Sequence, residues 1–329
     1  MRAREHKDLE QLIKRYESHR HTSALSTNIL AIVGLISFGL MAGPIFTSIG
    51  PIRVATTVQT PPVAPVRVFG SVSIRARSAV VYDLSTHTVL YGKQESSVLP
   101  LASLTKLFTV YTALTTLPQG TAVTLSESSL APEGDSGLKV GETLSLGALE
   151  RLALVASSND AAEAIAEATV RNTSNTSTAL MASAVSALGI TDVRASNPTG
   201  LDVSTSQSGG YGSALSVAKV ADSIVNLDPS LAHATTKSSV TVVSSDNVTH
   251  TLTNTNQTID AVPNPLISKT GFTDLAGGNL VVVFDAGINH PVAVVVLGST
   301  KDERFTDVST LVHKTLEYFS PAEGQTQTP

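Results

Sequence analysis

The chain has 329 residues, of which 42% are hydrophobic and 15% charged, and its formal net charge is −5. This composition excludes a highly charged disordered chain, supplies enough apolar material for a core, and allows about two domains at this length. A weakly acidic protein is a poor candidate for binding phosphates, so we expect no nucleic-acid partner. The absence of cysteine excludes disulfide scaffolds and thiol nucleophiles.

The first strongly apolar segment, residues 29–49, is about long enough to span a lipid bilayer. Residues 1–28 precede it and carry most of the nearby basic side chains. The long leading region favours an uncleaved transmembrane anchor, with a cleaved signal peptide as the alternative and a buried core helix as a weaker one. The basic N-terminus favours a protein that crosses the cell membrane once, with residues 1–28 in the cytoplasm and the residues after the anchor outside the cell.

Residues 50–70 are rich in Pro, Val and Thr, which predicts an extended linker. Residues 71–320 are within the length range of one folded domain. The polar tail, residues 321–329, is expected to be disordered.

Two short β-rich runs, residues 79–84 and 88–91, surround a polar three-residue loop and predict a hairpin. The next element is a helix over residues 104–114, because its apolar residues recur with helical spacing. They are Leu104, Leu107, Phe108, Tyr111 and Leu114.

Two more helices are predicted over residues 148–155 and 160–170. Asp160 and Glu163 resemble a capping box at the start of the second helix.

Three strand-like runs follow, at residues 266–272, 280–286 and 291–299, with a turn at 287–290 between the last two. An amphipathic helix over residues 305–319 ends the pattern. Strands at both ends and helices between them predict an α+β domain with an antiparallel sheet in which the two ends of the domain meet.

Several common catalytic motifs are missing. The sequence has no His-Glu-x-x-His, no phosphate-binding Gly-x-x-x-x-Gly-Lys-Ser/Thr loop and no Gly-x-Ser-x-Gly elbow. With no cysteine either, we expect neither a metal nor another cofactor.

Ser103 and Lys106 form a Ser-x-x-Lys motif at the start of the helix that follows Pro100. Positions three apart lie on one helix face, so the amine can reach the hydroxyl. Serine needs a neighbouring base to act as a nucleophile, and lysine serves as a base only where burial or nearby cations favour its neutral form. Taken alone, the motif is a weak signal, and two exposed first-turn side chains are the better interpretation.

Two further motifs have simple structural explanations when each is taken alone. Ser157-Ser158-Asn159 lies between two predicted helices, where Ser and Asn are common caps. Lys269-Thr270-Gly271 lies in a strand-like run, where a solvent-facing pair followed by a turn glycine is the ordinary interpretation.

Together and in this order, the three motifs resemble those of the low-molecular-mass penicillin-binding proteins, the D-alanyl-D-alanine carboxypeptidase family. The resemblance covers about residues 79–319. It extends to segments beginning at Pro100, Asp160, Asn197, Asn254, Phe272, Val296 and Arg304. It implies a β-lactamase/transpeptidase-like α+β fold, in which an antiparallel sheet flanked by helices is joined to a helical subdomain and follows the N-terminal transmembrane helix.

The resemblance also implies catalytic roles. Ser103 would attack the carbonyl of the penultimate D-alanine, and Lys106 would accept its proton. Ser157 would relay a proton to the leaving D-alanine, and Asn159 would orient Lys106 and bind the substrate amide. The backbone N–H groups of Ser103 and Phe272 would form the oxyanion hole.

The remaining family roles concern substrate binding. Lys269 would supply a positive field that helps to keep the catalytic lysine neutral. Thr270 and Arg304 would hold the terminal carboxylate of the substrate. Gly271 would let the substrate backbone lie close to the strand, next to Phe272. One departure is Ser158, where the family often has Gly or Ala, although the spacing to the asparagine favours Ser157 as the functional serine.

The implied function is that of a serine DD-carboxypeptidase acting on peptidoglycan stem peptides, with β-lactam antibiotics as inhibitors. A DD-endopeptidase that cuts cross-links would use the same motifs. A class A β-lactamase is less favoured, because residues 168–302 contain no glutamate for deacylation. An alternative of another class is a catalytically silent, membrane-anchored cell-wall binding protein.

Overall fold

The structure is a computed structural model that describes residues 68–134, 136–287 and 289–320. Its main sheet is antiparallel and has five strands in the order β10–β11–β12–β1–β2. These are β1 (Ser78–Asp83), β2 (Thr88–Lys93), β10 (Pro265–Thr273), β11 (Gly277–Asp285) and β12 (Pro291–Ser299). The pairing of β1 with β12 confirms the predicted sheet, in which strands from the two ends of the domain meet.

The central strands are rich in valine because both faces of the sheet are covered. All six residues of β1 are buried, and residues 292–297 of β12 are fully buried. Successive residues of a strand point to opposite faces, so Val294 joins one apolar cluster and Val295 the other. Double burial explains the continuous apolar runs in the sequence.

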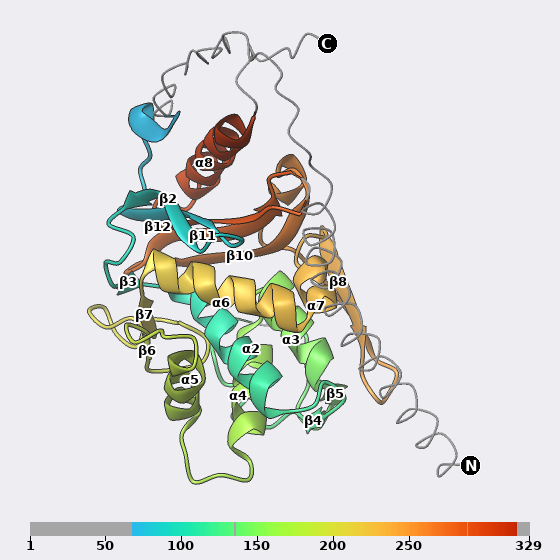
Figure 1. Cartoon of the computed structure of the whole chain (residues 1–329). Helices are drawn as coiled ribbons and strands as arrows, with labels where there is room; N and C mark the ends of the chain where they lie inside the picture. The colour runs from blue at the N-terminus through green and yellow to red at the C-terminus, as the bar shows by residue number, and fades with distance from the viewer. Residues whose placement is uncertain (1–67, 135, 288, 321–329) are drawn as a thin grey trace, which may run out of the picture. The chain divides into compact units, whose positions relative to one another are not determined.

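One face of the sheet is covered by α8 (Glu303–Phe319), which the sequence predicted as residues 305–319. Its apolar stripe includes Val308, Leu311 and Val312, which are buried against the sheet. Figure 1 shows α8 on one side of the sheet and α6 and α2 on the other.

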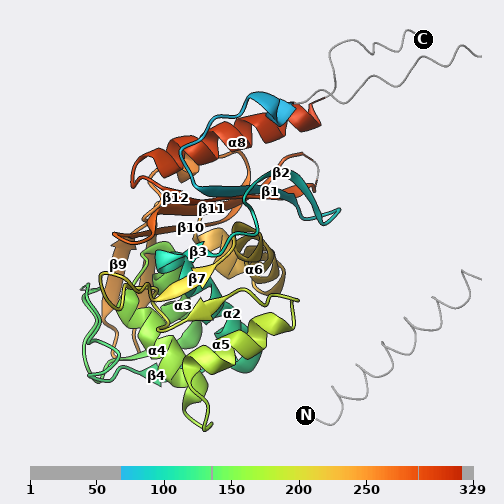
Figure 2. The same ribbon diagram turned by 90° about the vertical axis from the view of Figure 1, so that its left-hand side faces the viewer.

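The helical part packs against the opposite face. Its core unites side chains from the helices with Val80, Val281 and Val295 of the sheet. Its helices are α2 (Thr105–Thr116), α3 (Leu146–Val155), α4 (Asn159–Val170), α5 (Ser177–Ser186), α6 (Ala214–Leu227) and α7 (Pro229–Ala234). The view in Figure 2, turned by 90°, shows α2, α3, α4 and α5 grouped on the side of the sheet away from α8.

Three small sheets were not predicted, because most of their strands have only two or three residues and carry little periodicity. They contain β3 (Leu99–Pro100), β4 (Ala122–Thr124), β5 (Thr143–Ser145), β6 (Arg194–Ala195), β7 (Gly210–Gly212), β8 (Ser239–Val243) and β9 (Thr249–Thr253). The pairings are β3–β7–β6, β4–β5 and β8–β9. The first of these sheets holds the chain immediately before Ser103.

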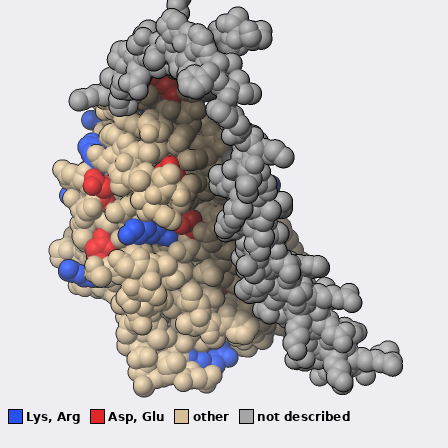
Figure 3. All heavy atoms as spheres, viewed as in Figure 1, with Lys and Arg blue, Asp and Glu red and all other residues tan. Residues whose placement is uncertain are grey.

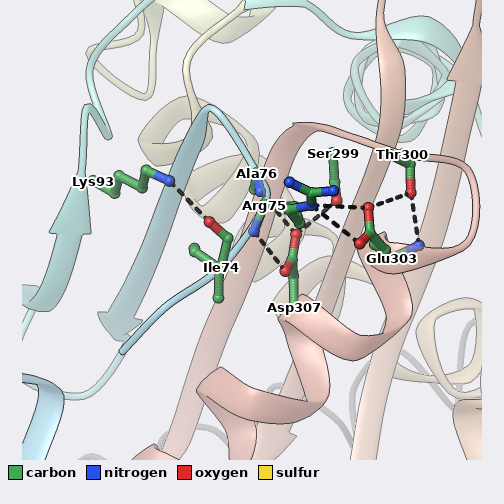
Figure 4. A network of polar contacts seen from close by, with 8 residues as sticks. All are labelled: Ile74, Arg75, Ala76, Lys93, Ser299, Thr300, Glu303 and Asp307. Atoms are coloured by element: carbon green, nitrogen blue, oxygen red, sulfur yellow. Dashed lines mark hydrogen bonds and ion pairs between the residues drawn. The ribbon is translucent and has the colours of Figure 1, made fainter. Parts of the chain in front are cut away.

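A buried carboxylate joins the start of the described chain to α8 (Figure 4). Asp307 accepts hydrogen bonds from the backbone N–H groups of Arg75 and Ala76, each at 2.9 Å, and from the Ser299 hydroxyl at 2.6 Å. The Arg75 guanidinium also contacts Glu303 at 3.1 Å. Before this point, the 3-10 helix η1 (Val68–Ser71) lies against the last turn of α8.

One detail of the helical prediction is wrong. The N-cap of α4 is Ser158, whose hydroxyl accepts the N–H of Ala161, so Asp160 lies inside the first turn and does not cap it. The Asp160 carboxylate accepts the backbone N–H of Ser136 at 3.2 Å. A serine two residues earlier took the capping role because Ser and Asp are comparable N-cap residues.

The predictions for residues 1–67 and 321–329 lie outside the described residues. Within the described ranges, no helix is long and apolar enough to cross a membrane. On the face in Figure 3, charged side chains of both signs are scattered singly over the described surface.

Candidate active site

Ser103 lies in a one-turn 3-10 helix, η2 (Ala102–Leu104), directly before α2. Ala102 has a positive φ of 48°, a strained conformation for a residue with a side chain. The turn is held from outside: the N–H of Leu101 donates to the Gly210 carbonyl of β7 at 2.9 Å. This contact fixes the turn, on which Ser103 is half-buried.

Lys106 is fully buried, and its ammonium nitrogen has three oxygen neighbours. Nζ lies 2.9 Å from Ser103 Oγ, 2.7 Å from Asn159 Oδ1 and 2.8 Å from the Thr199 carbonyl. Burial lowers the pKa of Lys106 from 10.5 to about 7. In the neutral amine, the Asn159 and Thr199 oxygens would occupy its two N–H groups, leaving the lone pair for the hydroxyl of Ser103.

The carbonyl of Thr199 is a site atom that the sequence did not reveal. It belongs to a turn that Asn197 shapes: Asn197 Oδ1 accepts from Gly200 N at 2.8 Å and from the Thr199 hydroxyl at 3.0 Å. A Cβ on Gly200 would lie 1.9 Å from the Ala102 carbonyl. The turn therefore requires glycine there, and the only sequence signal was the family-like segment that begins at Asn197.

The second motif divides its two serines between different tasks. Ser158 is buried, caps α4 and bonds to Ser136 Oγ at 2.5 Å. Ser157, with φ at 61°, points its hydroxyl at Lys269, with an Oγ–Nζ distance of 2.8 Å. Asn159 Oδ1 accepts a hydrogen bond from the ammonium nitrogen of Lys106, and its Nδ2 donates to the Glu133 carbonyl at 2.6 Å. Among the described residues, its second amide hydrogen has no partner and could bind a substrate.

Lys269 is also buried, and it lies on the edge strand β10. Its pKa is held well below 10.5, first by burial and then by the positive charges of Lys106 and Arg304. Burial is the main cause of the lowered pKa of Lys106. Repulsion between the two ammonium groups is mutual, and the predicted contribution of Lys269 to the neutrality of Lys106 stays a prediction.

Thr270 extends the site along β10. Its hydroxyl donates to the hydroxyl of Thr255 at 2.6 Å, and the Thr270 carbonyl accepts from Lys269 Nζ at 2.8 Å. Thr255 is held by its N–H, which donates to the Val155 carbonyl at 3.1 Å at the end of α3. Thr255 is a second site residue that the sequence placed only within a family-like segment.

Gly271 lies too close to the backbone around Ser103 for a side chain to fit. A Cβ there would lie 2.8 Å from the Leu101 carbonyl and 3.2 Å from the backbone nitrogens of Ser103 and Leu104. The sequence attributed this glycine to a close approach by the substrate. The structure instead shows a close approach of β10 to the turn that carries Ser103 (the serine turn, residues 101–104). This contact brings the edge of β10 next to the N–H of Ser103.

Phe272 lies near the end of β10, and Arg304 lies in the first turn of α8, from which it reaches the same strand. Arg304 is buried, its Nη1 donates to the Gly271 carbonyl at 2.8 Å, and its Nε has no hydrogen-bond partner within the described part of the chain. Phe272 is 42% exposed, and Lys301 Nζ lies 5.4 Å from the centre of its ring. The fold thus brings all nine predicted site residues to β10 and the helical elements facing it.

Within residues 68–134, 136–287 and 289–320, no group of three or more His, Asp or Glu side chains is placed to hold a metal ion. A cavity of about 560 Å³ lies between α8 and β11, among residues such as Val282, Phe305 and Ser309. None of the nine predicted site residues lines it, so it is separate from the Ser–Lys constellation.

Residues 59–301 match the profile of the D-alanyl-D-alanine carboxypeptidase family. The chain belongs to this family. The match includes every residue of the constellation except Arg304, which lies three positions beyond it.

Relatives with different named activities are similar to the chain. A D-alanyl-D-alanine endopeptidase of Pseudomonas aeruginosa is 31% identical over 79% of this chain and 83% of its own. The D-alanyl-D-alanine carboxypeptidase DacF of Bacillus subtilis is 28% identical over 72% of this chain and 61% of its own. The family is therefore shown, and the choice between the two activities is left open.

The fold is also that of solved penicillin-binding proteins. Penicillin-binding protein D2 of Listeria monocytogenes in its ampicillin-bound form has a TM-score of 0.62 at 22% identity, over 74% of this chain and 98% of that one. This agreement confirms the predicted α+β transpeptidase-like fold of the described residues.

Proposed function

We propose that the protein is a serine DD-carboxypeptidase that removes the terminal D-alanine of peptidoglycan stem peptides. The observation that carries the proposal is the buried amine of Lys106, 2.9 Å from the Ser103 hydroxyl and with a pKa of about 7. An amine with this pKa is partly neutral near pH 7, and it can accept the serine proton as the bond to the substrate carbonyl forms.

The oxyanion that forms on the substrate would lie between Ser103 and β10. Gly271 brings that edge strand against the N–H of Ser103, and the N–H of Phe272 is the second proposed donor. Donors fixed in place before the reaction stabilise the developing charge most effectively. Collapse of the tetrahedral intermediate would leave an acyl-enzyme on Ser103.

The leaving D-alanine needs a proton, and Ser157 is the proposed donor. Its hydroxyl is bonded to Lys269, so that pair forms a proton path to the leaving nitrogen. Thr270 of β10 and Arg304 of α8, which bonds to the Gly271 carbonyl, would hold the terminal carboxylate of the substrate. This carboxylate would supply the negative charge that the pair of buried lysines lacks.

Cleavage of cross-links is the second candidate, and the 31% identical relative that is named an endopeptidase favours it. The two reactions share every step at Ser103 and differ in the group on the leaving side of the scissile bond. Incubation of the full-length chain with a pentapeptide and, separately, with a cross-linked muropeptide dimer separates them. Free D-alanine from the first supports the carboxypeptidase; cleaved dimer without free D-alanine supports the endopeptidase.

Penicillin tests the common mechanism, since its strained ring resembles the D-alanyl-D-alanine amide. We expect an adduct on the peptide that contains Ser103, and a long-lived one, because residues 168–302 offer no glutamate for deacylation. Mass spectrometry locates the adduct. A catalytically silent wall-binding protein would give none, and an adduct on Ser157 would reverse the roles of the two serines.

We further propose that residues 29–49 anchor the protein in the cell membrane, with the catalytic domain outside. The anchored protein should keep its N-terminal residues and remain with membranes in high salt. Protease added outside should degrade the domain from about residue 71. A soluble product that begins after Gly50 would instead identify the segment as a cleaved signal peptide.

A further inference from the structure

Asn279 is a fully buried polar residue near the start of β11, directly before the apolar run of that strand. It lies on β11 and pairs with Gly271, the glycine that touches the serine turn. Its neighbours from Leu280 to Phe284 are all apolar. A buried amide in such surroundings is costly unless its donors and acceptors have partners.

The Asn279 oxygen completes a bulge in the sheet. The register between β11 and β12 shifts at this residue: Gly278 pairs with Ser299 and Leu280 with Val296. Two residues of β12 therefore face Asn279 alone, and Gly298 takes a positive φ of 69°. The N–H of Gly298 donates to Asn279 Oδ1 at 2.7 Å.

The Asn279 nitrogen reaches out of the sheet to the chain that carries the nucleophile. Nδ2 donates to the carbonyl of Pro100 at 3.0 Å. Pro100 ends β3, and Leu101, the strained Ala102 and Ser103 follow it directly. The Asn279 side chain thus connects the β11–β12 bulge to Pro100, the residue directly before the serine turn.

We propose that Asn279 is a positioning residue for acylation, which sets the gap between the N–H of Ser103 and strand β10. This inference rests on the proposed acyl-transfer function. Asn279 does not touch substrate. Gly271, across from it on β10, fixes how closely that strand can approach the turn, and the bond from Asn279 to Pro100 fixes the turn against the sheet.

The expected consequence is kinetic. Ala102 holds a strained conformation only while its surroundings impose it, so a turn released from the sheet should relax. The Ser103 N–H would then leave the place where the oxyanion forms. A displacement of about 1 Å at a reacting group can cost roughly 100-fold in rate. The noncovalent affinity should change little, because Lys269, Thr270 and Arg304 keep their places.

The test compares the full-length protein with Asn279→Ala and Asn279→Leu. Leucine fills a similar volume without either hydrogen bond, so it separates the bonds from the cavity. Acylation by a fluorescent penicillin is followed against concentration, at a temperature well below the unfolding midpoint of every variant. Both variants should lower the limiting acylation rate about 10- to 100-fold, with a change in the half-saturating concentration of less than about threefold.

Val283→Ala is the matched control. Val283 is fully buried on the same strand, but it has no bond to the serine turn. This variant should lose thermal stability and keep the wild-type acylation rate. The proposal is overturned if either Asn279 variant acylates at the wild-type rate, if Val283→Ala loses rate in the same proportion, or if neither Asn279 variant folds. A wild-type protein that penicillin does not label would refute the proposed function instead.

Discussion

Two Ser–Lys pairs lie side by side in this protein, and they arise in different ways. Ser103 and Lys106 are three residues apart on one helical segment, whereas Ser157 and Lys269 are 112 residues apart and meet across the helical part and the sheet. Their O–N distances are nearly equal, at 2.9 and 2.8 Å. Local geometry builds the first pair, and only the complete fold builds the second.

The two lysines also differ in what controls their protons. Burial lowers the pKa of Lys106, whereas Lys269 also experiences the positive charges of Lys106 and Arg304. Neither ammonium group forms an ion pair with a carboxylate among the described residues. The site is therefore short of negative charge, which a substrate with a terminal carboxylate would bring.

The largest effect should come from removing the local base. Lys106→Ala should slow acylation by penicillin about 10³-fold, because no other amine among the described residues is bonded to the Ser103 hydroxyl. Lys269→Arg keeps a positive charge and should still acylate measurably at high penicillin concentration. Stopped-flow acylation rates of the two variants show whether Lys106 alone acts as the base. Equal losses in both would show that the two pairs act as one unit.

Glu150 tests whether burial shifts the pKa of a carboxyl group in this fold, in the direction opposite to that of the buried lysines. It is fully buried on α3, and neither carboxylate oxygen has a hydrogen bond of normal geometry among the described residues. Burial is the largest cause of the rise in its pKa from 4.5 to about 7, with smaller opposing contributions from Gln119 and Arg151. The folded state therefore keeps the proton to higher pH than the unfolded state. The stability of the wild type should be intact below pH 4.5 and fall as the pH rises to 7, by about 3 kcal/mol.

Glu150→Gln has no charge to lose. It should match the wild type at pH 4.5 and exceed its unfolding free energy at pH 8, as measured by urea denaturation at both values. The exposed Glu127 gives the control, since Glu127→Gln should show no such difference. A Glu150→Gln variant that gains nothing at pH 8 would show that the buried carboxylate has found a partner.

A smaller effect is expected on the sheet side. Thr255→Val removes the oxygen that accepts the Thr270 hydroxyl bond at 2.6 Å. Loss of one such bond is worth about 1 kcal/mol, so KM for a pentapeptide should rise roughly fivefold, with a smaller change in kcat. Thr251→Val breaks an exposed Thr–Thr pair of similar geometry on the β8–β9 hairpin and should change neither constant. A fall in kcat alone would show that Thr255 contributes to the chemical step at Ser103 and Lys106, and not to substrate binding.

The smallest effect is proton uptake on binding. A substrate carboxylate near Lys269 would raise its depressed pKa, so the complex should take up a fraction of a proton at pH 7.5. Calorimetry of Ser103→Ala with a pentapeptide, in buffers of different ionisation enthalpy, measures the uptake. The same peptide with an amidated C-terminus should give none. Proton release would contradict a shortage of negative charge at the site.

Much of the fold could be predicted because its long elements have strong patterns. The valine runs of β11 and β12 and the amphipathic stripe of α8 were located to within a few residues. The β3–β7–β6 sheet was missed, because strands of two or three residues have no measurable period. Its importance comes from the contact between Leu101 and Gly210, which no local pattern reveals.

The site residues differ in the same way: those related by local spacing could be predicted, and those related by tertiary structure could not. Ser103 and Lys106 could be related to each other by helical spacing alone. The role of the Thr199 carbonyl depends on a backbone turn, and that of Asn279 on a bulge whose two strands must first be paired. Backbone acceptors and bulge registers belong to tertiary structure, and residue types do not encode them directly.

The hydrogen bonds that join Asp307 of α8 to Arg75 and Ala76 have a mechanical consequence. Tension applied through the chain ahead of Val68 would reach the contact of Phe69 with Tyr318, then the two amides held by Asp307, and then β1. Hydrogen bonds in an antiparallel sheet run across the strands, so a pull along β1 would load its bonds to β12 and β2 in shear, many at once. The load path runs through the sheet and α8. Ser103 and Lys106 lie on the helical part, outside this path. Lys269 lies in the same sheet on β10, so force would reach the pair that it forms with Ser157 before the Ser103–Lys106 pair.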